Sequence, residues 1–257
     1  MKRVREFPSL PMSPNIIIQE GALFIADAHE SSSRTNFLDF LEEIAQNPPP
    51  QLFLMGDMFD LLVGGIDYGT QKYKAYIERI DALAKYSEVV YLEGNHDFNL
   101  GSLFLHVKVI PIEKQPIVGI FPEGKQCLLS HGDKYGGTVH TLYTSWIRNR
   151  IVLRFLGFID KQCNNVISRT IESNQLKKKL CFPIHTFQAL IEEKLKHYPL
   201  QNIDYVAEGH YHQNKSFTCK GITYINFSSF ACNQSYFTVQ SSQKIEFVQK
   251  QLRGCNG

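Results

Sequence analysis

The sequence predicts an α/β fold in which helices and mixed sheets form a layered sandwich. Between residues 15 and 115, short apolar runs rich in β-branched residues alternate with apolar patterns of helical spacing. After residue 115 the apolar runs follow one another closely, which is typical of a strand-rich half. Residues 138–200 interrupt these runs with a helical pattern. We therefore expect a single domain over residues 1–257 that carries a helical lid insertion over residues 138–200.

The first half contains the alternating elements. A β-hairpin is expected over residues 15–29, where "NIIIQ" and "ALFIADAH" follow one another. Helices are predicted over residues 35–46 and 70–87, where apolar side chains repeat every three or four positions. Strands are predicted over residues 51–57 and 88–97, and each of them runs into a polar turn.

The second half contains the closely spaced strands and the insertion. Its strands are predicted over residues 116–121, 126–133, 204–210, 222–229, 235–240 and 244–249. The first helix of the insertion has more apolar residues than one helical face needs, namely Val152, Leu153, Leu156 and Ile159. Such a surplus suits either a helix buried on two sides or an apolar surface for a lipid or membrane, and we favour the buried helix.

Composition indicates a globular protein of the reducing cytoplasm. The apolar fraction of 43% supports a sizeable core. Six cysteines are scattered without Cys-x-x-Cys spacing, so we expect reduced thiols instead of a disulfide framework or a zinc ribbon. The basic N-terminal segment is broken by proline and lacks the apolar core of a signal peptide. No apolar run reaches the roughly 18 residues that a membrane span needs.

Polar side chains collect at the ends of five predicted strands. The stretch "GDMFD" at residues 56–60 follows a buried apolar run, and alone it would indicate a turn. Four other strands end in the same way, and in open α/β sheets the active crevice lies beyond the carboxyl ends of the strands. The polar residues at these ends are Asp27, His29, Asp57, Asp60, Asn95, His96, Asp97, His131, Asp133, His210 and His212. Oxygen and imidazole donors without thiolates suit Mn, Fe, Zn, Co or Ni.

The size of this donor set predicts two metal ions. One zinc takes about four ligands, whereas two metals that share a carboxylate form the arrangement used to hydrolyse phosphoesters. The motifs D-x-H, G-D-x-x-D, G-N-H-D, H-G-D and G-H-x-H, in this order, resemble those of the calcineurin-like metallophosphoesterases. The resemblance extends over about residues 21–245. It implies a four-layer α/β/β/α sandwich.

The resemblance also implies a role for each motif residue. Seven residues would hold the metals. Asp27, His29 and His212 would bind the first metal, and Asn95, His131 and His210 would bind the second. Asp57 would bind both. Two divalent ions are implied, and we expect manganese, with Fe, Zn, Co or Ni as alternatives. His96 would donate to the leaving oxygen or stabilise the phosphoryl oxygens. Asp60, Asp97 and Asp133 would orient the ligands and the backbone.

The insertion is the best indication of the substrate. Residues 148–179 contain eight basic and two acidic residues. Such a segment could face an anionic substrate or an anionic membrane surface, or it could be a solvated helix face. We assign substrate binding to Arg148, Arg150 and Arg154.

The layout is similar to that of the bacterial UDP-diacylglucosamine diphosphatases of lipid A synthesis. That family has a basic, apolar helical lid at the same place, a phenylalanine as in "HDFNLG" and a final strand like "QSYFTV". The similarity implies hydrolysis of a lipid-linked pyrophosphate to UMP and lipid X, with peripheral contact to the cytoplasmic face of the inner membrane. Two features depart from the family pattern: His96 replaces its usual arginine, and "KYGGTVH" replaces a Cys-Thr-Asp-Asp-like stretch.

Two alternatives stay open. Another phosphoesterase of the same superfamily would act on nucleotides, phosphoproteins or nucleic acid, because the fold does not determine the substrate. The single Trp and the net charge of +2 argue against a nuclease, so no nucleic acid is expected as a partner. The other alternative is a non-catalytic scaffold on the same fold, which would have lost ligands, and none of the seven is lost. The oligomeric state is not indicated.

Overall fold

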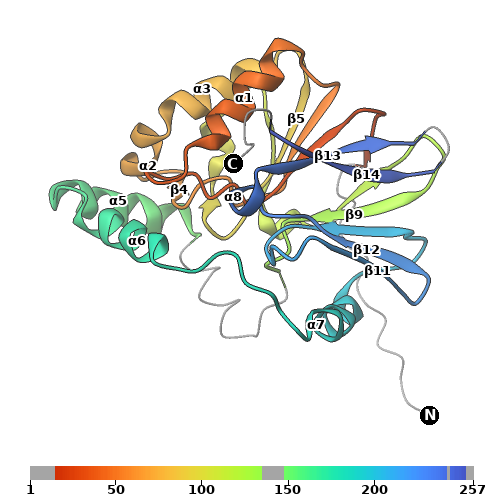
Figure 1. Ribbon diagram of the computed structural model, residues 1–257. Coiled ribbons are helices and arrows are strands. Elements are labelled where there is room, and N and C mark those ends of the chain that lie inside the picture. Colours follow the sequence, from red (N-terminus) through yellow and green to blue (C-terminus); the bar gives the residue numbers. More distant parts are fainter. Residues whose placement is uncertain (1–14, 135–147, 242–243, 253–257) are drawn as a thin grey trace.

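Two six-stranded sheets pack face to face between layers of helices in the computed structural model, which describes residues 15–134, 148–241 and 244–252 (Figure 1). The first sheet has the order β1 (Ile16–Ile17), β8 (Ile117–Ile120), β9 (Gln126–Ser130), β10 (Tyr205–Glu208), β12 (Ile222–Asn226) and β11 (Lys215–Cys219). The second has the order β14 (Glu246–Gln251), β13 (Ser235–Gln240), β2 (Leu23–Ile25), β3 (Gln51–Leu54), β5 (Glu88–Leu92) and β7 (Lys108–Ile110). A two-stranded sheet joins β4 (Leu62–Val63) to β6 (Asp97–Phe98).

Helices cover the outer face of each sheet, which confirms the predicted four-layer α/β/β/α sandwich (Figure 1). The described helices are α1 (Asn36–Gln46), α2 (Asp67–Lys72), α3 (Lys74–Leu83), α5 (Arg150–Gln162), α6 (Val166–Leu176), α7 (Phe187–Lys194) and α8 (Phe230–Asn233). Short 3₁₀ turns are η1 (Leu100–Ser102), η2 (Ile112–Lys114) and η3 (Leu195–His197). In the described part of the chain, no helix is long and apolar enough to cross a membrane.

Aromatic side chains fill the space between the two sheets. The rings of Phe24 and Phe53, on neighbouring strands, stack with their centroids 4.3 Å apart. Phe227 lies after β12 of the opposite sheet, and its ring centroid is 5.6 Å from that of Phe24. All three side chains are fully buried. Burial of this apolar area is the main force that holds the sheets together.

The predicted hairpin over residues 15–29 is wrong, because β1 and β2 belong to different sheets. β1 pairs with β8, and β2 pairs with β3. The side chain of Gln51 takes the place of a neighbouring strand for β1: it accepts the N–H of Gln19 at 2.7 Å and donates to the carbonyl of Ile17 at 2.7 Å. These bonds give the N–H of Gln19 and the carbonyl of Ile17 the hydrogen-bond partners that a neighbouring strand would otherwise supply.

The insertion divides into two parts. Helix α7 packs Phe187 and Ile191 against the outer face of the first sheet, so it forms the fourth layer of the sandwich. Among the described helices of the insertion, α5 and α6 project beside the sheets, next to α2 (Figure 1). Residues 138–147, with which the predicted insertion begins, lie outside the described residues.

Helix α5 is not buried on two sides, as the sequence had led us to expect. It packs Leu153 against Val63 and Phe98. Its other apolar face is exposed, with Ile151 at 79% and Phe155 at 64% of their full accessible surface. The surplus residues lie on the inner side, with Leu153 buried and Val152, Leu156 and Ile159 partly buried, while Ile151, Phe155 and Phe158 form an exposed apolar surface.

The expectation of reduced cysteines is wrong for one pair. Cys181 and Cys232 form a disulfide between the segment after α6 and helix α8. The two residues are 51 positions apart, and scattered cysteines give no information about such pairing. Because disulfides are rare in reducing compartments, this bond weighs against the cytoplasmic location that the cysteine pattern suggested.

A buried ion pair connects α7 to the end of β10. Lys194 donates to Glu208 at 2.7 Å and to the carbonyl of Gly132 at 2.6 Å. Ser130 and Tyr224 also donate to the Glu208 carboxylate, at 2.8 and 2.9 Å. Burial would raise the pKa of Glu208, but the charge and hydrogen bond of Lys194 outweigh it and lower the pKa. Glu208 is therefore a buried, fully compensated charge.

We predict that Lys194→Met lowers the free energy of unfolding at neutral pH by about 3–5 kcal/mol, because it leaves the Glu208 charge buried and unpaired. Urea denaturation measures the change. The loss should shrink as the pH falls, because a protonated Glu208 needs no counter-charge. Lys196→Met is the matched control: its ion pair with Glu193 is exposed, and no measurable change is expected. Equal losses in both variants would contradict this account.

The disulfide makes a separate prediction. Protein denatured without a reductant should take up two fewer alkylating groups than protein that is reduced first, because the disulfide protects Cys181 and Cys232, while Cys127, Cys163 and Cys219 are free thiols. Mass spectrometry of the alkylated chains gives the two numbers. Equal uptake would show that this pair is not bonded.

Candidate metal centre

The polar residues predicted from the sequence meet where five strands end. Strands β2, β3 and β5 are parallel neighbours, and so are β9 and β10 in the other sheet. Their carboxyl ends therefore lie together at one edge of the sandwich, where α/β folds commonly place their sites. The seven predicted ligands follow these strands directly.

Three groups of donor atoms converge at this edge. The members of each group lie within 4.8 Å of one another, and the groups are Asp27 with His29 and His212, His29 with Asp57 and His96, and Asp57 with His131 and His210. Asp57 belongs to two of them, and its Oδ2 lies 3.4 Å from His131 Nε2. The amide oxygen of Asn95 lies 3.4 Å from the same ring nitrogen. The structure thus brings all seven predicted ligands, and His96, into one site.

The backbone at the site is strained. Five of the predicted ligands have left-handed φ angles, at Asp27 (52°), His29 (44°), Asp57 (53°), His210 (65°) and His212 (57°). Residues other than glycine rarely adopt this conformation, and such strain is typical of functional sites. The sharp turns it creates allow residues two positions apart to face the same point.

Two glycines allow the ligand loops to approach closely. A Cβ on Gly94 would lie 2.2 Å from Asp57 Oδ1, and one on Gly209 would lie 2.6 Å from Asp27 Oδ2. Both distances are far below van der Waals contact, so no larger residue fits while the carboxylates keep their places. This explains why G-N-H-D and G-H-x-H begin with glycine.

Hydrogen bonds fix how three imidazoles are oriented. The Nδ1 atoms of His131 and His212 lie 2.9 and 3.0 Å from the carbonyl oxygens of Met55 and Leu180. His29 Nδ1 lies 3.1 Å from the Asp60 carboxylate. Because these oxygens only accept, each Nδ1 carries a proton, and Nε2 is the ring nitrogen that faces the site. This is the usual way that proteins prepare histidine for a metal.

Asp60 and Asp97 orient the ligands from behind. Asp60 is buried between His29 and the guanidinium of Arg34. Asp97 accepts the N–H groups of Asp57 at 2.9 Å and of Gly94 at 2.9 Å. Burial, together with the nearby charge of Asp57, raises the pKa of Asp97 to about 7.

The charge balance of the site suits bound cations. Asp27 and Asp57 are almost completely buried, at 0% and 2% exposure. Burial would raise the pKa of Asp57, but the charges of His131 and His96 outweigh it and hold the pKa well below its usual value. Burial would lower the pKa of His131, but Asp57 raises it well above its usual value. Buried carboxylates need positive charge close by, and oxygen and imidazole donors within 4.8 Å of one another can hold divalent metals that supply it.

The three predicted substrate-binding arginines are not among the residues that line the cavity at the metal centre. Arg148 donates to the Asp133 carboxylate at 3.3 Å and to the carbonyl of Gly94 at 3.1 Å, so it braces the ligand loops. Oδ1 of Asp133 has no hydrogen-bond partner within the described residues. Arg150 and Arg154 are exposed on α5, and neither lines the cavity at the metal centre.

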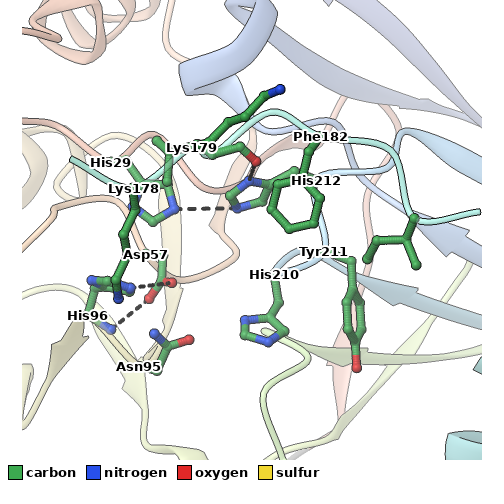
Figure 2. Close-up of a pocket in the computed structure, with 12 residues that line it drawn as sticks. His29, Asp57, Asn95, His96, Lys178, Lys179, Phe182, His210, Tyr211 and His212 are labelled. Carbon is green, nitrogen blue, oxygen red and sulfur yellow. Dashed lines mark hydrogen bonds and ion pairs between the residues drawn. The ribbon is translucent and has the colours of Figure 1, made fainter. Parts of the chain in front are cut away.

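Other residues line this cavity, which has a volume of about 280 Å³. Beside the ligands and His96 they are Lys178, Lys179, Leu180, Phe182, Ile184 and Tyr211 (Figure 2). Sequence reasoning did not assign them to the site. The "KKKL" run was visible as charge, but a segment without periodicity gives no information about the direction in which it points.

Comparisons with known proteins agree with this geometry. The sequence pattern of the calcineurin-like phosphoesterase family matches residues 22–214. A Photorhabdus laumondii protein named UDP-2,3-diacylglucosamine hydrolase is 26% identical, over 74% of this chain and 81% of its own. Proteins of the same name from Coxiella burnetii and Vibrio vulnificus are 24% and 30% identical, over 74% and 50% of this chain and 80% and 58% of theirs.

Solved structures of an archaeal phosphodiesterase and of an E. coli phosphoesterase are also similar. The archaeal protein has a TM-score of 0.46 at 11% identity, over 89% of this chain and 98% of its own. The E. coli protein has a TM-score of 0.41 at 17% identity, over 90% of this chain and 98% of its own. The family pattern spans most of the sandwich and all seven predicted ligands. The chain belongs to the calcineurin-like phosphoesterase family of metal-dependent hydrolases.

Proposed function

We propose that the protein hydrolyses the pyrophosphate bond of UDP-2,3-diacylglucosamine or of a closely similar lipid-linked nucleotide, using two divalent metal ions. The observation that carries the proposal is the position of Asp57, whose carboxylate belongs to two of the three donor groups. A carboxylate in that position can bind two cations at once, which is the arrangement used for phosphoester hydrolysis.

We assign the ligands as the family resemblance implies. Asp27, His29 and His212 would hold one ion, and Asn95, His131 and His210 the other, with Asp57 binding both. Manganese is our first choice of metal, with Fe, Zn, Co or Ni as alternatives. When bound, the ions would polarise the phosphoryl group and make a water acidic enough to attack it.

Hydrolysis then requires little covalent chemistry from the protein. A water oxygen forms a bond to one phosphorus, the bridging P–O bond breaks, and its electron pair stays on the departing phosphate. His96 faces the cavity, with its Nδ1 3.0 Å from the carbonyl of Asp60. Since Nδ1 carries the proton in that bond, Nε2–H exists only in the imidazolium, which is the form that donates to a leaving oxygen or stabilises phosphoryl charge.

The lipid part of the proposal rests on the relatives' name and on helix α5. Ile151, Phe155 and Phe158 are exposed on this helix, and Arg150 and Arg154 are exposed on it as well. Apolar and basic side chains on one helix suit a surface of anionic lipids. We therefore propose that the protein meets its substrate at the surface of an anionic membrane.

We predict that the Mn²⁺-loaded protein cleaves UDP-2,3-diacylglucosamine to UMP and also cleaves bis-p-nitrophenyl phosphate. Asp57→Ala should abolish both activities and reduce the bound metal, because each ion loses a ligand. Release of UMP and elemental analysis measure the two effects. Cleavage of bis-p-nitrophenyl phosphate alone would favour a phosphoesterase with another substrate, and full metal content in Asp57→Ala would refute the shared carboxylate.

His96 makes a separate prediction, because it also lies in one of the donor groups. His96→Ala should lower kcat by roughly 10²–10⁴-fold, the usual contribution of a proton donor, and should leave the metal content unchanged. Steady-state kinetics and elemental analysis on the same sample test both statements. Loss of one metal ion would mean that His96 is a ligand.

A further inference from the structure

A short segment crosses the mouth of the cavity at the metal centre. We call residues 177–184, between the end of α6 and the approach to α7, the strap. Of its residues, Lys178, Lys179, Leu180, Phe182 and Ile184 line the cavity (Figure 2). The strap therefore supplies nearly half of the cavity wall and none of the predicted ligands.

The strap is anchored to both sides of the metal centre. On one side, Leu180 accepts from the His212 ring, and Gln213 bonds to the carbonyl of Phe182 at 3.0 Å and to the N–H of Ile184 at 2.8 Å. On the other side, the disulfide joins Cys181 to Cys232 in α8.

Helix α8 is itself bonded to the strand that leads to the first ligand. The N–H of Ala231 donates to the Asp27 carbonyl at 3.1 Å, and the N–H of Phe230 donates to the Ala26 carbonyl at 2.9 Å. The strap is thus connected to the loop that carries His212 and, through α8, to the loop that carries Asp27. A segment held in this way needs little further ordering when a ligand binds.

The two cavity-lining lysines of the strap point in different directions. Figure 2 shows Lys178 reaching toward the side of the site where Asp57 and His96 lie, whereas Lys179 extends away from them. Both are exposed, and within the described residues neither ammonium group has an ion-pair or hydrogen-bond partner. An unpaired ammonium directed into this cavity is available to bind an anionic group of a ligand.

The opposite wall of the cavity is apolar and aromatic. Phe182 is half exposed, and Tyr211 and Ile184 line the cavity with it. A group attached to a bound phosphate would meet these side chains. The cavity therefore combines three parts: donors for a reacting phosphoryl group, an ammonium for a second anionic group, and an apolar surface for a substituent.

We propose that Lys178 binds the phosphate that leaves, so that the strap selects substituted pyrophosphates over simple phosphoesters. The proposal rests on the pyrophosphate chemistry proposed above. When the bridging P–O bond breaks, its electron pair stays on the leaving phosphate, and the Lys178 ammonium stabilises the added negative charge. A simple phosphoester has no second phosphate and makes no use of this residue.

Calorimetric titration of Mn²⁺-loaded protein with methylenediphosphonate and with inorganic phosphate tests the proposal. Lys178→Ala should raise the ratio of the diphosphonate Kd to the phosphate Kd by about 10- to 100-fold, the effect of losing one charged hydrogen bond. Lys177→Ala is the matched control: it removes the same charge one residue away, outside the cavity, and should leave the ratio unchanged. Lys179→Ala should change it less than Lys178→Ala.

Each outcome decides between definite alternatives. An unchanged ratio in Lys178→Ala, or an equal change in Lys177→Ala, would overturn the proposal, because the effect would then be absent or no more than general electrostatics. Binding is measured without turnover, so the result does not depend on the substrate. If UDP-2,3-diacylglucosamine is not cleaved but the ratio changes as expected, the subsite stands and only the lipid substrate is wrong.

Discussion

A single buried carboxylate, that of Asp97, joins the ends of β3 and β5. It accepts the N–H groups of Asp57, Met58 and Gly94, and the hydroxyl of Tyr91 donates to it at 2.6 Å. Because the Asp57 carboxylate reaches two of the three donor groups, the geometry of the whole centre depends on where Asp97 holds this turn. The residue that sets the site thus contributes no atom to the donor groups, and its satisfied hydrogen bonds explain how it tolerates complete burial.

The α5–α6 hairpin is attached to this frame through polar contacts and one small apolar cluster around Leu153. Glu172 of α6 is nearly buried, pairs with Lys72 and accepts the hydroxyl of Tyr68 at 2.6 Å. Asp160 of α5 accepts the N–H of Ile167 at 2.9 Å, at the beginning of α6. Because hydrogen bonds and an ion pair hold much of the hairpin in place, one apolar face of α5 stays exposed. Attachment through hydrophobic burial would have covered that face.

The sequence predicted the parts of the structure that depend on local signals. The fourfold layering and the meeting of Asp27, Asp57 and His210 at one edge follow from apolar runs that end in polar residues, and these endings are visible in the chain. The pairing of β1 was not predictable, because its partner β8 is distant in the sequence: Ile16 lies opposite Gly119. The position of the strap was not predictable either, because a disulfide and hydrogen bonds to residues distant in the sequence determine it.

The left-handed ligands set the stability of the fold against its chemistry. Five such residues, each strained by about 1–3 kcal/mol, lower the stability of the folded chain. Glycine at any of these positions would relieve the strain, because it has no Cβ, but it would also remove a donor atom from the site. Substitutions that make this protein more stable would therefore be found readily at these positions, and each of them would weaken the metal centre.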